Sequence, residues 1–151
     1  MSESPAVTVM SARLTDLRAI DVHRIYKLRV DVFVHEQRQP FAEIDDTDAE
    51  PTTLHLVAYG DESDEPLGVA RVFPDADEQG ALRIGRVCVA ADERGKGIAS
   101  VLMEEALDQS GGVFVLDAQE YLEKWYSSFG FERNGENFLD EGIPHVPMRR
   151  A

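Results

Sequence analysis

The sequence predicts a single α/β domain of the mixed α+β kind, in which helices flank one central sheet. Three observations lead to this prediction. The chain of 151 residues has the length of one domain. Short apolar runs typical of strands alternate with segments whose apolar residues recur at helical spacing. No repeat, linker or low-complexity segment divides the chain, so residues 1–151 are expected to form one domain with the order β-α-β-β-β-α-β-α-β-β.

In the first half of the chain, turn-forming residues separate the predicted elements. Thr15 and Asp16 offer a helix N-cap, and the helix predicted after them, 17–36, carries apolar residues mostly at helical spacing. Residues 37–53 hold two prolines and five acidic residues, which predicts a loop or a short helical turn. The acidic turn 61–66 indicates a hairpin between the strands on either side of it. Strands are expected at 7–14, 54–59, 67–73 and 82–89.

The second half begins with a glycine-rich loop, 94–97, that leads into a helix ending near 110–112. A short buried strand is expected at 113–116. The next helix has its aromatic and apolar residues at i, i+3, i+4 and i+7, and Gly130 provides a C-terminal stop. Those residues are Leu122, Trp125, Tyr126 and Phe129. The closing strands are expected at 131–139 and 145–149.

The charge of the chain is strongly negative. Acidic residues number 29 against 15 basic ones, which gives a net charge of −14. Nucleic-acid binding is disfavoured, because phosphate recognition requires a basic face. The acids are spread along the whole chain, which favours a solvated acidic surface like that of halophile proteins. Recruitment of a basic substrate is the alternative.

The chain shows no sign of export or of a membrane span. Cys88 is the only cysteine, so no disulfide can form within the chain, and a reducing compartment is favoured. The N-terminus lacks a basic start followed by an apolar stretch, so no signal peptide is expected. No apolar run approaches the ~18 residues that a membrane span needs. We therefore expect a cytoplasmic protein with no membrane partner.

The loop Arg94-Gly95-Lys96-Gly97 lies between a predicted strand and a predicted helix, which is a place suited to an anion. A flexible connection without a ligand is the alternative. A nucleotide-binding P-loop is excluded, because Ala90 and Gly97 stand where that motif requires a glycine and a Ser or Thr. The dinucleotide fingerprint is matched in two of its three glycines, with Asp117 near the expected distance.

A third pattern accounts for more of the chain. The residues 94–99 satisfy Arg/Gln-x-x-Gly-x-Gly/Ala, and they resemble the pyrophosphate loop of the GNAT superfamily of N-acetyltransferases. The segments on either side, RIGRVCVA and IASVLMEEAL, resemble the central motif of that family, and DAQEYLEKWYSSFGF resembles its next strand-helix segment. Two further segments resemble the ElaA-type subgroup: LRVDVFVHEQRQPFAEIDDTDAEPTTLHL and EGIPHVPM.

The resemblance implies a GNAT-like fold with a mostly antiparallel mixed sheet, and acetyl-CoA as co-substrate. It implies direct transfer of an acetyl group to the amine of a small-molecule or peptide acceptor, and it leaves a homodimer open. By match to the family, the pyrophosphate would lie on Arg94, Gly95, Lys96, Gly97, Ile98 and Ala99. The pantetheine arm would contact the strand residues Val87, Cys88 and Val89, with Gln119 close to it.

The resemblance also suggests which residues act on the substrates. Tyr126 matches the tyrosine general acid of the family, although its spacing is also that of a core aromatic. Glu36 is the candidate general base, with a solvated helix-end glutamate as the alternative. Candidates for acceptor binding, or for ordering the loop or the core instead, are Asp45, Asp48, His55 and His145.

No metal site is expected, since His23 and His35 have no partner at ligand spacing. Cys88 is expected to be a small buried residue rather than a nucleophile. Two other functions stay open: a CoA-sensing or interaction module without turnover, and a dinucleotide-dependent enzyme. The sequence does not distinguish among polyamine, amino acid, antibiotic and protein acceptors.

Overall fold

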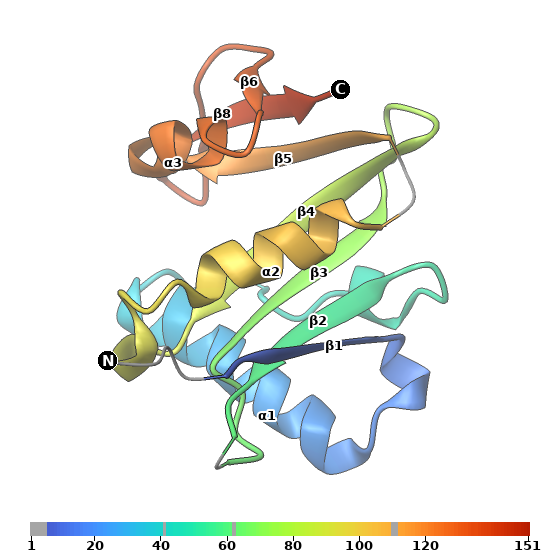
Figure 1. Cartoon of the computed structure of the whole chain (residues 1–151). Coiled ribbons are helices and arrows are strands. Elements are labelled where there is room, and N and C mark those ends of the chain that lie inside the picture. The colour runs from blue at the N-terminus through green and yellow to red at the C-terminus, as the bar shows by residue number, and fades with distance from the viewer. Residues whose placement is uncertain (1–5, 41, 62, 110–111) are drawn as a thin grey trace, which may run out of the picture.

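The structure is a computed structural model that describes residues 6–40, 42–61, 63–109 and 112–151. It contains an eight-stranded sheet with the order β1-β2-β3-β4-β5-β8-β6, in which β7 also pairs with β8 (Figure 1). The strands are β1 (Thr8–Ala12), β2 (Leu54–Tyr59), β3 (Gly68–Pro74), β4 (Ala81–Val89), β5 (Val113–Gln119), β6 (Glu132–Arg133), β7 (Phe138–Asp140) and β8 (Ile143–Arg150). Among the strands of the described residues, β4 and β5 alone pair in parallel. The predicted mixed, mostly antiparallel sheet is therefore confirmed.

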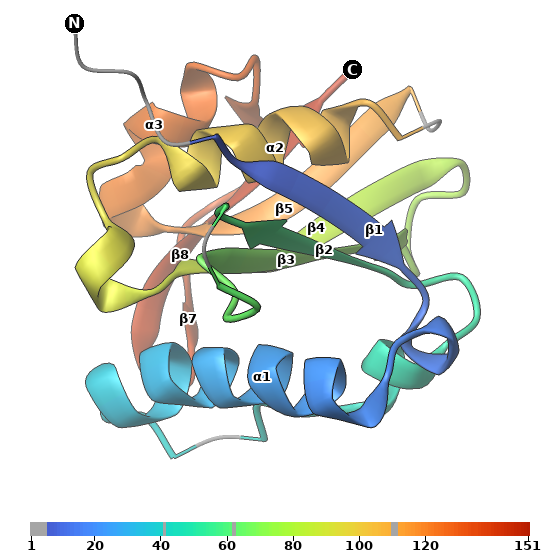
Figure 2. The same ribbon diagram turned by 60° about the horizontal axis from the view of Figure 1, so that its bottom comes forward.

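Helices cover both faces of the sheet (Figure 2). On one face lies α1 (Ala19–Val30), and on the other lie α2 (Ile98–Leu107) and α3 (Glu123–Ser127). Because both faces are covered, the central strands β2 and β3 are buried along most of their length. The alternation of side chains along each strand then divides the apolar residues between two cores.

The larger core lies between the sheet and the pair α2 and α3. Leu102 and Met103 of α2 are completely buried there against sheet residues such as Leu56 and Phe114. The smaller core lies under α1, where Ile25 packs with Val57, Val69 and Cys88 of the neighbouring strands. The sheet is thus the middle layer of three.

The predicted N-cap at Thr15 and Asp16 is wrong. Residues Leu14–Asp16 form a separate 3-10 turn, in which the Asp16 amide donates to the carbonyl oxygen of Arg13. Helix α1 begins only after Arg18, which makes no side-chain cap. The helix continues from Asp31 to Glu36 as a π-helix, so the helical segment ends where the sequence predicted.

The C-terminal part differs from the prediction in several respects. The predicted strand 131–139 is divided into β6 and β7, because Asn134 and Gly135 turn the chain between them; the Asn134 amide donates to the Pro147 carbonyl oxygen. Strand β5 runs on to Gln119, three residues beyond its predicted end. The helix predicted to carry Leu122 to Phe129 is shorter than expected: α3 ends at Ser127, and a turn leads to Gly130, at φ 94°. The predicted helix end at Ser110 and Gly111 lies outside the described residues.

Within the described ranges, no helix combines the length and the apolar character that crossing a bilayer would require.

Candidate functional site

The sheet opens into a cleft where β4 and β5 part. These two strands pair only over Ala81–Arg83 and Val113–Val115. Beyond that point β4 stays with β3 and β5 stays with β8, and the two halves of the sheet diverge (Figure 1). A pocket of about 730 Å³ lies between them, within the ~300–1,000 Å³ typical of ligand sites. Beyond the paired residues, the facing edges of β4 and β5 have no strand partner among the described residues, which leaves room for a ligand chain between them.

Strand β4 contains a β-bulge beside the pocket. The β3–β4 register passes from Val69↔Cys88 to Arg71↔Gly85, so Arg86 and Val87 together face a single residue of β3. Arg86 has a φ of 53°, in the left-handed region, which costs a non-glycine residue on the order of 1–3 kcal/mol. A bulge re-aims the groups around it. Three of the residues expected at the pantetheine arm follow directly and line the pocket: Val87, Cys88 and Val89.

The glycine loop lies at one end of the pocket and is open. Gly95 and Gly97 have φ angles of 81° and 79°, and a Cβ on either would have no atom within 4 Å. Arg94 and Ala99 line the pocket, whereas residues 95–98 do not. The Ile98 side chain is buried at 3% exposure in the core under α2, so only its backbone can face a ligand. Gly97 is the N-cap of α2, which gives the loop the favourable helix end for an anion.

Glu36 is bound to the glycine loop. Its Oε2 and Oε1 atoms accept from Nη1 and Nη2 of Arg94 at 2.7 and 2.8 Å. The hydrogen bonds from Arg94 hold the pKa of Glu36 below its usual value. The neighbouring Gln37 accepts from Gln119 Nε2 at 3.4 Å, so the end of the π-helix is tied to both sides of the cleft mouth. Both oxygens of the predicted base are thus engaged, and a substrate amine would have to displace an arginine to reach them.

Tyr126 belongs to the core and also lines the pocket. It is 8% exposed, with its ring edge-on to Trp125 at 4.8 Å and to Phe131 at 6.4 Å. Burial, with a smaller contribution from Tyr121, raises the pKa of Tyr126 to about 12. A tyrosine hydroxyl is protonated at neutral pH at its ordinary pKa as well, and the raised pKa makes Tyr126 a weaker acid than a solvent-exposed tyrosine.

Cys88 is buried and faces the same pocket. Burial, followed by the negative charge of Glu43, raises the pKa of its thiol to about 12. A thiol must be deprotonated to act as a nucleophile, so this environment suits a small packed residue.

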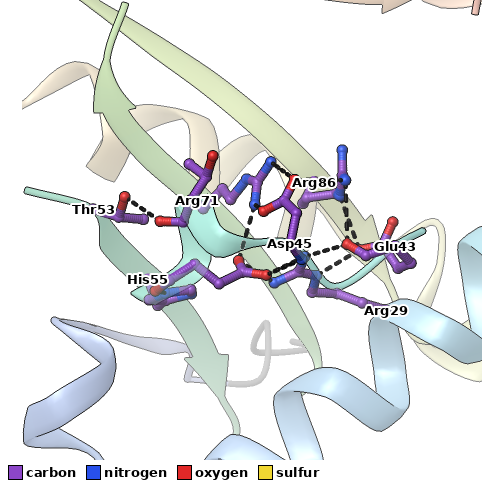
Figure 3. Close-up of polar contacts among 9 residues, drawn as sticks. Arg29, Glu43, Asp45, Thr53, His55, Arg71 and Arg86 are labelled. Atoms are coloured by element: carbon purple, nitrogen blue, oxygen red, sulfur yellow. Dashed lines mark hydrogen bonds and ion pairs between the residues drawn. The ribbon is translucent and has the colours of Figure 1, made fainter. Parts of the chain in front are cut away.

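A network of arginines and carboxylates connects α1 with β3 and β4 (Figure 3). Three of its members, Glu43, Arg71 and Arg86, line the pocket. Arg29 of α1 donates from Nε to Glu43 at 2.7 Å and from Nη1 to Asp48 at 2.7 Å. Arg71 of β3 donates to both Asp45 and Asp48. Four elements that are distant in sequence meet here: α1, the 43–48 segment, β3 and β4.

The same network holds the bulge of β4. Arg86 Nε donates to Glu43 Oε2 at 2.9 Å, and Arg86 Nη2 donates to the Glu43 carbonyl oxygen at 3.2 Å. These charge-assisted bonds offset the backbone strain of Arg86. Glu43 thus connects α1 with the strand that borders the pocket.

The predicted acceptor-binding residues have different surroundings. Asp48 and His55 are 1% and 2% exposed and lie behind the pocket wall, where His55 Nε2 bonds the Asp48 carbonyl oxygen at 2.9 Å. Burial alone would raise the pKa of Asp48, but hydrogen bonds and charge from Arg29, with the charge of Arg71, hold it below its usual value. Asp45 is partly exposed, and Arg71 engages both of its oxygens. The structure thus does not bring these residues to the pocket surface.

His145 does line the pocket, on β8. Its ring stacks on Phe138 at 5.8 Å, and Nδ1 bonds the Ile143 carbonyl oxygen at 2.8 Å. Asp140, the last residue of β7, and Glu141 of the following turn line the pocket as well. Sequence reasoning did not single these two out, nor Glu43, Arg29, Arg71 or Arg86. The signal for Arg71 was a charged residue inside an otherwise apolar strand.

Within the described part of the chain, no group of three or more His, Cys, Asp or Glu side chains is placed to hold a metal ion.

Comparison with known proteins gives a consistent result. Residues 21–151 match the model of a family described as an acetyltransferase (GNAT) domain. The chain is 39% identical over 136 residues to the UPF0039 protein Rv2851c of Mycobacterium tuberculosis, an alignment that covers 89% of this chain and 87% of the relative. It is 31% identical over 141 residues to protein ElaA of Escherichia coli, covering 90% and 91% of the two chains.

Solved structures agree with the sequence relatives. An acyl-CoA N-acyltransferase from Pseudomonas aeruginosa superposes with a TM-score of 0.88 at 32% identity, covering 97% of this chain and 100% of that one. The crystal structure of Escherichia coli ElaA superposes with a TM-score of 0.87 at 28% identity, with the same coverage.

Proposed function

The chain belongs to the GNAT acetyltransferase family, and on that premise we propose that it transfers an acetyl group from acetyl-CoA directly to the amine of a small-molecule or peptide acceptor. One arrangement carries the proposal: a cleft between diverging strands, with an open glycine loop at one end and Tyr126 in its wall. The solved relatives that share this fold include an acyl-CoA N-acyltransferase.

The glycine loop is the proposed pyrophosphate site. The positive φ angles of Gly95 and Gly97 let successive amides turn toward one anion, and the absence of side chains at these positions allows a close approach. Arg94 and Lys96 supply positive charge, and each is held by an acidic neighbour, Glu36 and Glu93 respectively. A bound pyrophosphate would share or replace those neighbours.

The free edge of β4 is the proposed site of the pantetheine arm. An extended chain placed between β4 and β5 can pair with the backbone of Val87–Val89, as an added strand would. Gln119, at the end of β5, borders the same space. The bulge at Arg86 re-aims the amides beside it, and an amide directed at the thioester oxygen would stabilise the negative charge that develops there.

Acetyl transfer then needs two proton movements. An alkylamine of pKa ~10.4 costs about 4.6 kcal/mol to deprotonate at pH 7, so a proton acceptor beside it accelerates attack. The departing thiolate needs a proton, and the protonated hydroxyl of Tyr126 is the proposed donor. The raised pKa of Cys88 favours direct attack by the amine over an acyl-enzyme on that thiol.

A screen of amine acceptors with acetyl-CoA, read as release of the CoA thiol, tests the proposal. We expect release with at least one class of amine, and a parallel series with propionyl-CoA measures the preference for acetyl. Tight binding of acetyl-CoA without thiol release for any amine would instead support a CoA-sensing module.

Tyr126→Phe tests the proton donor. The substitution removes only the hydroxyl, so the ring contacts with Trp125 and Phe131 remain. We expect kcat to fall about 10²–10⁴-fold, with acetyl-CoA affinity nearly unchanged, in steady-state kinetics and calorimetry. Phe129→Leu is the matched control, since Phe129 packs on the same core but does not line the pocket. Turnover of the Tyr126 variant within a few-fold of the wild type would exclude this role.

A further inference from the structure

Glu43 is a buried carboxylate in which one of the two oxygens has no hydrogen-bond donor among the described residues. Its side chain is 2% exposed, and Oε2 accepts from Nε of both Arg29 and Arg86. Its Oε1 atom has no hydrogen-bond partner among the described residues. Leaving such an atom buried without a donor costs about 1–3 kcal/mol. A ligand that donates to Oε1 would recover this cost.

Three other carboxylates, Asp48, Asp45 and Glu36, are already engaged at both oxygens. Asp48 accepts from Arg29 and Arg71, Asp45 accepts from Arg71, and Glu36 accepts from Arg94. Unlike these three, Glu43 has an oxygen that can receive a new donor without losing an old one.

Glu43 also faces the strand segment that would hold the thioester. It lines the pocket together with Arg86, Val87 and Cys88, and its charge contributes to the raised pKa of the Cys88 thiol. Strand β4 itself, ALRIGRVCV, contains no acidic residue. The carboxylate beside this part of β4 therefore comes from Glu43, in the segment that follows α1.

The charges of the pocket favour a cation. Four arginines line it, and each is already bound to an aspartate or a glutamate; they are Arg71, Arg83, Arg86 and Arg94. By contrast, Asp140 and Glu141 form no salt bridge with any described residue. Two residues with positive φ, Glu141 at 50° and Gly142 at 79°, form the turn that carries them. The pocket therefore offers unpaired negative charge. Its four arginines are all in salt bridges, although Nε of Arg71 has no hydrogen-bond partner among the described residues.

We propose that the acceptor is an alkylamine with two positive charges, that Glu43 binds its reacting ammonium group, and that Asp140 and Glu141 attract the second charge. This inference rests on the proposed function and names the acceptor class for the same cleft. An amine with a neighbouring carboxylate, such as an amino acid, would bring a negative charge to a site where every lining arginine is already in a salt bridge with a carboxylate.

The reaction balances with these groups. The ammonium group gives one proton to Glu43, which releases it to solvent, and the freed electron pair forms the C–N bond. The C–S bond breaks as this bond matures, and the sulfur takes a proton from Tyr126. The second proton lost by the nitrogen replaces the one that Tyr126 gave. Ammonium and acetyl-CoA thus yield an amide, the CoA thiol and one proton in solution.

Acceptor series provide the first test. With acetyl-CoA as donor, kcat/KM should be about fivefold higher for 1,4-diaminobutane than for 1-aminobutane, which corresponds to an exposed ion pair of ~1 kcal/mol. Both should exceed alanine. A higher kcat/KM for alanine than for the diamine would overturn the proposal.

Glu43→Gln provides the second test, because it keeps the shape and an acceptor for Arg29 and Arg86 but removes the charge. We expect kcat/KM for the diamine to fall at least about 10²-fold, with acetyl-CoA affinity unchanged by calorimetry. Glu36→Gln is the matched comparison at the other end of the cleft, and its effect should appear in acetyl-CoA affinity. A Glu43 variant that folds and acetylates the diamine like the wild type would overturn the proposal.

If Glu43→Gln fails to fold, substitutions at Asp140 and Glu141 still test the proposed diamine acceptor. The double variant Asp140→Asn/Glu141→Gln should lower kcat/KM for the diamine to the value for the monoamine, and a retained preference would contradict the proposal. Failure of the proposed function gives a different result, namely no thiol release with any amine. Thiol release that is indifferent to all these variants contradicts only the acceptor assignment.

Discussion

The glycine loop and the buried network form two sides of one cleft, and they are built in opposite ways. The loop is a continuous segment that presents backbone, with open space where Gly95 and Gly97 lack side chains. The network consists of side chains from separate elements, held at distances such as 2.7 Å between Arg29 and Glu43, both almost fully buried. A continuous backbone site depends on the conformation of a few residues. A network depends on every member being present, since each loss leaves another charge buried without a partner.

The largest effect should follow from breaking the network. Arg29→Met leaves Glu43 without one of its donors and Asp48 without its bidentate partner, so the free energy of unfolding should fall by about 3–5 kcal/mol. Urea denaturation measures it. Lys27→Met, on the same helix, removes only an exposed pair with Asp31 and should cost at most about 0.5 kcal/mol. If the two variants lost similar amounts of unfolding free energy, the buried ion pairs of Arg29 would contribute no more to stability than the exposed pair of Lys27.

A substitution in the loop should affect binding instead. Gly97→Glu places a negative charge where the pyrophosphate is proposed to lie, and acetyl-CoA affinity should fall at least about 100-fold, or about 2.7 kcal/mol. Gly97→Ala is the matched control. Both variants bear the strain of a side chain at φ 79°, but only glutamate adds charge. Calorimetry that gives the same affinity for both would remove the pyrophosphate from this loop.

The network should also make stability depend on pH. Burial lowers the pKa of His55 below its ordinary value of 6.5, so the unfolded chain binds a proton more readily than the folded one. The stabilisation from neutral His55 is complete above about pH 6.5 and decreases as the pH falls below it. We expect the melting temperature to fall between pH 7.5 and 5, and the fall to be smaller in His55→Gln. The exposed His23→Gln should retain the full slope.

At still lower pH the carboxylates of the network contribute. Asp48 has a lowered pKa in the folded protein, so its contribution is present above about pH 4 and is lost as the pH falls through the folded value. The test of His55 itself lies above pH 5. If the melting temperature of His55→Gln falls with pH as steeply as that of the wild type there, protonation of His55 does not contribute to the pH dependence of stability.

Salt should have the smallest effect and should act on the surface. With a net charge of −14, screening relieves self-repulsion as the Debye length shrinks to ~3 Å at about 1 M. We expect the melting temperature to rise with KCl, by about 2–4 °C for each kcal/mol gained. Because buried pairs are screened much less, Arg29→Met should remain destabilised by a similar amount at 1 M. A flat or falling melting temperature would contradict salt adaptation of the surface.

The same contrast explains what could be predicted from sequence. The glycine loop and its helix lie within a few consecutive residues, so spacing alone indicated an anion site and the family resemblance. The strand Leu54–Tyr59 was predicted at its true bounds, because turn residues and a continuous apolar run mark it locally. The mixed sheet and the family are confirmed by the structure and the comparisons.

The network could not be predicted in this way. Arg29, Glu43, Asp48, Arg71 and Arg86 are spread over four elements, and only the folded sheet brings them together. The division of the strand predicted at 131–139 was foreshadowed by Asn134 and Gly135, a common turn pair. Gly135 also lies where a Cβ would approach Pro147 Cγ at 2.8 Å, a constraint that is visible only in three dimensions.

The short pairing between β4 and β5 has a mechanical consequence. The two halves of the sheet are hydrogen-bonded to each other only over Ala81–Arg83 and Val113–Val115 among the described strand residues. Beyond this short ladder, no strand pairing connects them in the described part of the chain. Fluctuations that open the molecule should concentrate there. A ligand that pairs with the facing edges of both β4 and β5 would connect the two halves of the sheet. The substrate-bound protein should therefore be stiffer and more resistant to proteolysis than the free protein.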